Sequence, residues 1–183
     1  MKPRCSVFIA TSLDGFIARE DGSIDWLNLA SAAASPGEDY GYAAFFATVD
    51  ALVMGRKTFE QVLTFEPWPY GETPLVVMSR TLSAPPPGAP PAVSVTAEAP
   101  TELVARLSDA GCRRIYVEGG ATIRSFVAAG LIDDMTITVI PVLLGAGRPL
   151  FGPLPSEAWL ALESSKAYPS GLVQLVYRAK WNS

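Results

Sequence analysis

Short apolar strands alternate with helices along the first two thirds of the chain, and this alternation constrains the fold more than any other feature. The residue pattern predicts strands at 5–10, 51–54, 75–78, 93–95 and 114–117, and helices at 38–48, 55–63, 100–110 and 122–129. Strands connected through helices run parallel, and the helices cover both faces of the sheet. We therefore expect a three-layer α/β fold with a mostly parallel central sheet.

A different pattern follows Asp133. Residues 135–144 and 172–181 are long β-rich runs, and no helix between them is long enough for a clear crossover connection. We expect C-terminal strands that add antiparallel at one edge of the sheet. The small residues at 29–37 predict an irregular segment. A chain of 183 residues without a repeat or a linker is predicted to form a single domain, residues 1–183.

The chain contains no histidine. That absence excludes the Ser-His-Asp and Cys-His nucleophile systems and every histidine-ligated metal site. The two cysteines, Cys5 and Cys112, lie far apart in segments predicted to be buried, so we expect free thiols and no thiolate zinc site. We therefore expect no metal, and proton transfer must use carboxylates, tyrosine, lysine, backbone or water.

The charge distribution argues against nucleic-acid and membrane partners. The net charge is −4, and Lys and Arg form no cluster that could bind a nucleic acid or an anionic membrane. The apolar runs are shorter than the roughly 20 residues that span a bilayer, and the N-terminal residues alternate like a strand instead of forming the apolar core of an export signal. We expect a soluble, cytoplasmic protein whose partner is a small-molecule substrate.

Two strand-to-helix junctions contain glycine, at Gly55–Thr58 and at Gly119–Thr122. In a parallel sheet both junctions lie at the carboxyl ends of strands, where ligands of open α/β sheets bind. A helix N-terminus presents unpaired N–H groups, and glycine lets an anion approach them closely. The Gly119-Gly120 pair therefore suits a diphosphate. The alternative is a plain tight turn, and the spacing alone favours neither interpretation.

Neither of the common phosphate-binding fingerprints is present. In the GRKT sequence at 55–58 the lysine does not directly follow the glycine, and Asp50 stands where the leading glycine of a P-loop belongs. The GAG sequence at 145–147 lacks the third glycine of the Rossmann motif, and Pro149 and Pro153 replace the helix that should receive a pyrophosphate. Any dinucleotide must therefore bind in another way.

Five motifs in order resemble the dihydrofolate reductase superfamily. They are ATSLDGFIA (10–18), VMGRKTFE (53–60), VVMSR (76–80), VEGGATI (117–123) and PVLLGAGRPLF (141–151). More closely, the chain resembles the reductase domain of bifunctional riboflavin-biosynthesis enzymes and its stand-alone relatives, the RibD C-terminal domain family. The zinc-binding deaminase domain of the bifunctional enzymes has no counterpart in this sequence.

The resemblance implies a dihydrofolate-reductase-like fold and an NADPH-dependent reductase. It implies that the adenosine side of NADPH and its phosphates contact Gly55, Arg56, Lys57 and Thr58, and that the 2′-phosphate contacts Ser79 and Arg80. It implies further that the diphosphate contacts Gly119, Gly120, Ala121 and Thr122, and that the nicotinamide contacts Ala10, Thr11 and Ile17. It also implies a cis peptide bond between Gly119 and Gly120, because the paired glycines of this family are commonly joined in that way.

Three carboxylates are candidates for the proton-transfer step. Asp39 matches, by counting back from Gly55, the acidic residue that binds the pterin in dihydrofolate reductases. If it is partly buried, desolvation would raise its proton affinity; the alternative is a first-turn helix residue favoured by the helix dipole. Asp14 belongs to a turn that borders the substrate in the riboflavin branch. Glu118 is either a substrate ligand or a carboxylate that holds the loop.

The favoured function is that of a 5-amino-6-(5-phosphoribosylamino)uracil reductase-like protein of the riboflavin type, in which NADPH reduces a C=N or C=O bond of a small heterocycle or a sugar-linked pyrimidine. Candidates for a substrate phosphate are Arg19, Arg124 and Arg148. The alternatives are a dihydrofolate or other pteridine reductase and an NADPH-binding protein without turnover. Because relatives in the riboflavin branch are typically dimers, the resemblance also implies a homodimer.

Overall fold

The computed structural model describes residues 1–32 and 37–181. The strands are β1 (Arg4–Ser12), β2 (Phe16–Ala18), β3 (Ala51–Gly55), β4 (Leu75–Met78), β5 (Val93–Thr96), β6 (Arg114–Glu118), β7 (Ile132–Ile140), β8 (Arg148–Pro149), β9 (Trp159–Ala167) and β10 (Val173–Lys180). The helices are α1 (Asp25–Ala32), α2 (Tyr42–Phe46), α3 (Arg56–Val62), α4 (Pro100–Asp109) and α5 (Gly120–Ala128). None of the described helices is long and apolar enough to cross a membrane.

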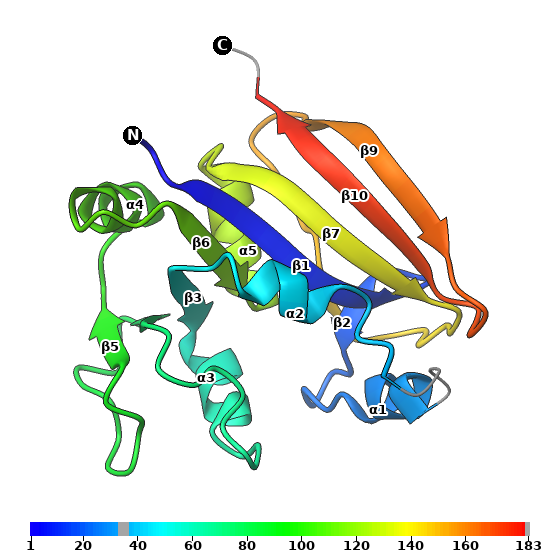
Figure 1. The fold of residues 1–183 in the computed structure, drawn as a ribbon, viewed down its shortest axis with the longest axis horizontal. Helices are drawn as coiled ribbons and strands as arrows, with labels where there is room; N and C mark the ends of the chain where they lie inside the picture. The colour runs from blue at the N-terminus through cyan, green and yellow to red at the C-terminus, as the bar shows by residue number, and fades with distance from the viewer. Residues whose placement is uncertain (33–36, 182–183) are drawn as a thin grey trace.

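One eight-stranded sheet forms the centre of the molecule, in the order β5-β4-β3-β6-β1-β7-β10-β9 (Figure 1). The six strands from β5 to β7 pair parallel, and β10 pairs antiparallel with both β7 and β9. The predicted antiparallel edge is confirmed, but it begins one strand later than expected. Because α5 returns the chain across the sheet between β6 and β7, β7 must run parallel to its neighbour β1.

Apolar side chains of the strands alternate between two helix layers. Val53 of β3 belongs to a core with Phe126 of α5, whereas Leu52 and Met54 belong to a separate core with Phe59 of α3. Figure 1 shows α2 in front of the sheet and α5 behind it. This alternation follows from the two-residue period of a strand, and it confirms the predicted three-layer α/β class.

The segment between β2 and β3 differs most from the sequence-based expectation. The helix predicted at 38–48 is limited to α2, because Tyr40 and Gly41 have left-handed φ values of 57° and 82° that break a helix. Helix α1 begins before the segment that was expected to be irregular, and only its last four residues, 29–32, fall in that segment. Its Trp26, 3% exposed, packs with Ile140 of β7. Part of the expected irregular segment, residues 33–36, lies outside the described residues.

Candidate active site

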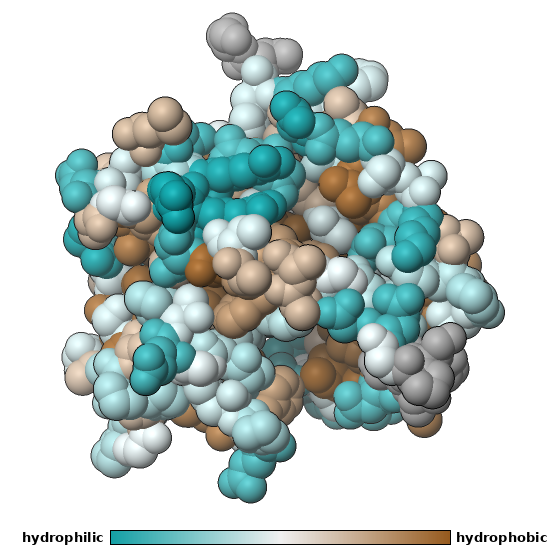
Figure 2. Space-filling model, in the orientation of Figure 1, coloured by the Kyte–Doolittle hydropathy of each residue, from teal (hydrophilic) through white to brown (hydrophobic). Residues whose placement is uncertain are grey.

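A cleft of about 660 Å³ opens at the carboxyl edge of the sheet. Figure 2 shows the molecule hollowed between the part that carries α3 and the part that carries α1, with apolar residues visible inside the hollow. Strand β1 provides an apolar wall through Phe8, Ile9 and Ala10, and Ile17 of β2 extends it. Small-molecule sites commonly have this size, with mostly apolar walls and a few converging polar groups.

The loop from β6 into α5 forms another wall through Gly119, Gly120 and Ala121. A Cβ atom built on Gly119, which has φ +83°, would lie 2.2 Å from Thr58 Oγ1, and one built on Gly120 would lie 2.7 Å from Ile17 Cδ1. Since neither residue has a side chain, the backbone itself lines the cleft where α5 begins. The first N–H groups of a helix have no intrahelical partner, so this end of α5 suits an anion.

The expected cis bond between Gly119 and Gly120 is wrong. Among the described residues, the cis peptide bond found is Glu66–Pro67. The positive φ of Gly119 turns the chain into α5 without a cis bond.

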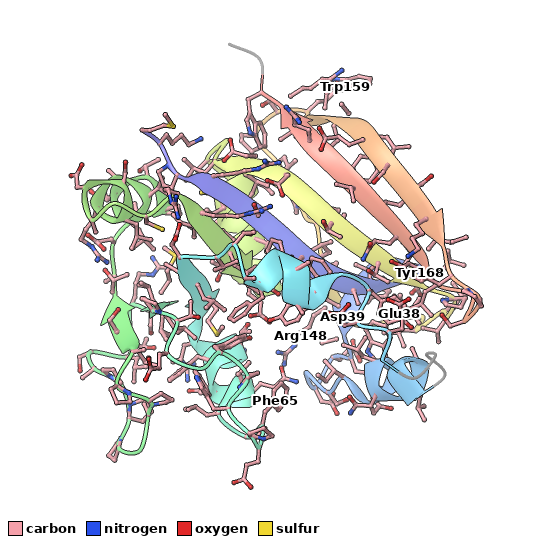
Figure 3. The ribbon with its side chains drawn as sticks, in the orientation of Figure 1. Glu38, Asp39, Phe65, Arg148, Trp159 and Tyr168 are labelled. Atoms are coloured by element: carbon pink, nitrogen blue, oxygen red, sulfur yellow. The ribbon has the colours of Figure 1, made fainter. Side chains whose placement is uncertain are left out.

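Three cationic side chains, Lys57, Arg124 and Arg148, line the cleft. Arg124 donates to a backbone carbonyl of β8 at 2.6 Å, and Arg148 donates to a backbone carbonyl of the loop after β2. None of the three forms an ion pair among the described residues. Figure 3 shows Arg148 pointing into the space between α3 and α1. The cleft therefore favours an anionic ligand.

Glu118, at the end of β6, is the one carboxyl-bearing residue of the described chain that lines this cleft. Burial raises the pKa of its carboxyl, an effect that the hydrogen bond from Tyr70 partly opposes. The Tyr70 hydroxyl donates to Glu118 Oε2 at 2.5 Å. Two further tyrosines face the same region, Tyr42 of α2 and Tyr116 of β6. Such a carboxyl keeps its proton to higher pH than an exposed glutamate and can deliver it to a ligand.

Seven of the residues expected to contact a cofactor line the cleft, namely Ala10, Ile17, Lys57, Thr58, Gly119, Gly120 and Ala121. Thr11 is 4% exposed within β1, and Gly55 and Thr122 lie against each other behind the wall of the cleft. Arg56 is held by an ion pair with Glu60 at 2.6 Å, one helical turn away, and does not line the cleft. Thr11, Gly55, Arg56 and Thr122 were therefore expected to contact the cofactor but do not line the cleft.

Ser79 and Arg80 line a separate hollow of about 280 Å³ at the carboxyl ends of β4 and β5. The Ser79 hydroxyl accepts the backbone N–H of Leu82 at 2.9 Å, which shapes the turn after β4. Arg80 is exposed and has no ion-pair partner in the part of the chain that the structure describes. Because β3, β4 and β6 run parallel, this hollow lies on the same edge of the sheet as the cleft.

The environments of Asp39 and Asp14 differ from that of Glu118. Asp39 is exposed, and its carboxylate accepts the backbone N–H groups of Ala43 and Gly41 at 2.8 Å each, so the pKa of Asp39 is lowered. The expectation of a desolvated carboxyl with a raised proton affinity is therefore wrong for Asp39, which caps the start of α2 and borders a smaller pocket of about 130 Å³ beside the cleft.

Asp14 is exposed and stabilises a loop. The hydroxyl of Ser12 and the backbone N–H groups of Gly145 and Leu144 donate to its carboxylate and lower the pKa of Asp14. It does not line the cleft. Sequence reasoning placed Tyr42 near the cleft, beside Asp39, but did not identify Tyr70 or Tyr116 as parts of the site. Nothing in their local sequence sets them apart from ordinary core tyrosines.

Comparison with known proteins identifies relatives of this chain. The model of the RibD C-terminal domain family matches residues 3–174. The uncharacterized protein YwjB of Bacillus subtilis (strain 168) is 38% identical over 185 residues, which cover 97% of this chain and 98% of that protein. A second Bacillus subtilis protein, the uncharacterized protein YyaP, is 29% identical and covers 95% of this chain and 93% of its own length.

Solved structures share the fold. A protein from Shewanella sp. PV-4 named for riboflavin biosynthesis has a TM-score of 0.90 and 39% identity, with 97% of this chain and 99% of that chain covered. The Thermotoga maritima diaminohydroxyphosphoribosylaminopyrimidine deaminase/5-amino-6-(5-phosphoribosylamino)uracil reductase has a TM-score of 0.72 and 15% identity, and the match covers 98% of this chain and 57% of that chain. The Thermotoga likeness is one of fold alone.

Proposed function

The chain belongs to the RibD C-terminal domain family, and from that premise we propose that it is an NADPH-dependent reductase of a small heterocyclic or ribosylamino-pyrimidine substrate. The family match and the solved relatives support a riboflavin-pathway reductase-like fold. The observation that carries the proposed activity is the placement of the proton-holding carboxyl of Glu118 in one cleft with the glycine loop and three cations.

The residues present fit NADPH. Gly119 and Gly120 line the cleft and carry no side chain, so a diphosphate can approach the backbone N–H groups at the start of α5. Lys57 and Arg124 add positive charge to the same wall. The hollow at Arg80 lies on the same sheet edge and offers a cation and hydroxyl groups for a further phosphate.

The reduction of a C=N bond needs a hydride at carbon, which NADPH supplies, and a proton at nitrogen. In this proposal the apolar wall of Phe8, Ile9 and Ala10 orients a flat ring and excludes water, and the protonated carboxyl of Glu118 supplies the proton. Arg148 points into the space between α3 and α1 and suits a phosphate group on the substrate.

The discrimination between NADPH and NADH tests the cofactor assignment. We expect Arg80→Ala to weaken NADPH binding roughly 10- to 100-fold and to leave NADH binding unchanged, because a charge-assisted hydrogen bond contributes about 1.5–3 kcal/mol. Quenching of tryptophan fluorescence during titration measures both affinities. Arg113→Ala is the matched control, since Arg113 is 89% exposed at the opposite edge of the sheet. Equal affinity for both nucleotides in the wild type would contradict the assignment of the 2′-phosphate.

The effect of Asp39→Asn on turnover distinguishes the proposed reductase from a pteridine reductase. If Asp39 served dihydrofolate as the acidic residue of dihydrofolate reductases does, this substitution would abolish turnover. We expect instead a loss of no more than a few-fold, because the exposed carboxylate is engaged with the N–H groups of Gly41 and Ala43 and asparagine keeps an oxygen that can accept one of them. The assay follows NADPH oxidation with aminopyrimidine and dihydrofolate substrates in parallel. Tight NADPH binding without oxidation by any substrate would indicate a binding protein without turnover.

A further inference from the structure

The two carboxyl oxygens of Glu118 differ in their surroundings. Oε2 accepts the Tyr70 hydroxyl, whereas no described residue donates to Oε1. Trp26 Nε1 is the one side-chain polar atom that is both closed off from solvent and without a hydrogen-bond partner, among the described residues that are not exposed. Oε1 of Glu118 is therefore not sealed, and because Glu118 lines the cleft, this oxygen is open to a ligand there.

Tyr70 is itself held rigidly. It lies in the loop between α3 and β4 and is 4% exposed. Its ring packs edge-on against Trp68, with centroids 5.3 Å apart, and contacts Phe46 of α2 at 6.0 Å. Burial, together with the neighbouring Glu118, raises the pKa of the Tyr70 phenol far above its ordinary value. The raised pKa keeps the hydroxyl protonated, and so a hydrogen-bond donor, at neutral pH.

We propose that Tyr70 is a positioning residue, which holds the Glu118 carboxyl by Oε2 so that Oε1 meets the substrate. The inference rests on the proposed function, in which Glu118 is the proton donor. When the O–H bond at Oε1 breaks, the proton passes to the substrate nitrogen as that atom's electron pair forms the new N–H bond. The carboxylate that remains keeps the hydrogen bond from Tyr70 and takes a new proton from water in the cleft.

The other groups around Glu118 do not hold it in the same way. The Tyr116 hydroxyl donates to the carbonyl oxygen of Phe8 at 2.8 Å and is therefore engaged elsewhere. The Tyr42 hydroxyl, from α2, has no described partner. Lys57, Arg124 and Arg148 line the same cleft, but none forms an ion pair with Glu118. Tyr70 is thus the one described residue that fixes the orientation of this carboxyl.

The titration of Glu118, without cofactor or substrate, tests the inference directly. In protein labelled with ¹³C at the glutamate carboxyl, we expect Tyr70→Phe to move the Glu118 midpoint to higher pH, by about tenfold in proton affinity, because the ionised form loses a hydrogen bond. Incorporation of 3-fluorotyrosine at position 70, a stronger donor, should move the midpoint to lower pH. Tyr168→Phe is the matched control, since the Tyr168 hydroxyl donates to Gln174 and lines neither pocket.

The same variants are then assayed with substrate. We expect Tyr70→Phe to lower kcat about 10- to 100-fold with a smaller change in KM, and to move the alkaline limb of the pH profile with the titration midpoint. Unchanged kcat and midpoint in Tyr70→Phe, or equal changes in Tyr168→Phe, would overturn the inference. If the wild type oxidises no NADPH with any substrate, the proposed function fails instead, so the two failures are distinguishable.

Discussion

Replacing Glu118 by glutamine is expected to lower kcat by about 10²- to 10⁴-fold, the usual contribution of a general acid. Glutamine keeps the size of the side chain and an oxygen that can accept the Tyr70 hydroxyl, but it has no acidic proton to give. Steady-state oxidation of NADPH measures the effect. The affinity for NADPH should remain within a few-fold of the wild type, because in our proposal the cofactor is held by the glycine loop and the cations.

The pH dependence of stability provides a second measurement on the same variant. Because the pKa of Glu118 is raised, the folded protein binds this proton more tightly than the unfolded chain does. The free energy of unfolding therefore falls as the pH rises from the ordinary pKa of glutamate through the raised value. Below the ordinary pKa both the folded and the unfolded state are protonated at Glu118, so the free energy of unfolding does not change there because of this group. Glu118→Gln removes this dependence, so its stability relative to the wild type should increase as the pH rises above about 4, the ordinary pKa of glutamate.

Glu163→Gln is the matched control for both measurements. Glu163 lies on the edge strand β9 and pairs with Arg178, away from the cleft. The control should leave kcat unchanged. Near-normal turnover in Glu118→Gln would contradict the assignment of Glu118 as the proton donor. If Glu118→Gln became less stable relative to the wild type as the pH rises, that result would contradict the raised pKa of Glu118.

Gly119→Ala is expected to have the second large effect, on cofactor binding. The new Cβ would lie 2.2 Å from Thr58 Oγ1 and 3.1 Å from Thr58 Cβ, so α3 or the loop before α5 must shift. We expect the affinity for NADPH to fall about 100-fold, which corresponds to roughly 2.7 kcal/mol. The free energy of unfolding should fall by about 2–4 kcal/mol, from the positive φ and from overpacking together.

Gly111→Ala is a control for a positive φ without crowding; Gly119 has in addition ψ 131°, outside the left-handed helical region, so its backbone cost is the larger of the two. Gly111 has nearly the same φ, +84° against +83°, but a Cβ there has nothing within 4 Å. The control should cost only the backbone term of about 1–2 kcal/mol and leave NADPH affinity unchanged. Thermal unfolding and nucleotide titration of both variants measure the two effects. If Gly119→Ala binds NADPH as tightly as Gly111→Ala does, the diphosphate does not lie against this loop.

Local patterns were sufficient to predict the parts of the fold that depend on near neighbours in the chain. The strand at 75–78 has the predicted bounds, and α4 begins at the predicted Pro100. Apolar periodicity and helix-start signals act over only a few residues, so the sequence carries them directly. The segment between β2 and β3 was predicted poorly, because the left-handed Tyr40 and the burial of Trp26 depend on contacts with distant strands.

The candidate site divides in the same way. The α/β class and the glycine junction at the end of β6 could be predicted from the residue pattern, because strand alternation and the backbone freedom of glycine are local properties. Only the tertiary structure ranked the three carboxylates. It left Asp39 and Asp14 exposed with lowered pKa values, and it placed the half-buried Glu118 against Tyr70, 48 residues away in the chain. Desolvation and hydrogen-bond geometry arise from surroundings that form only when the chain folds.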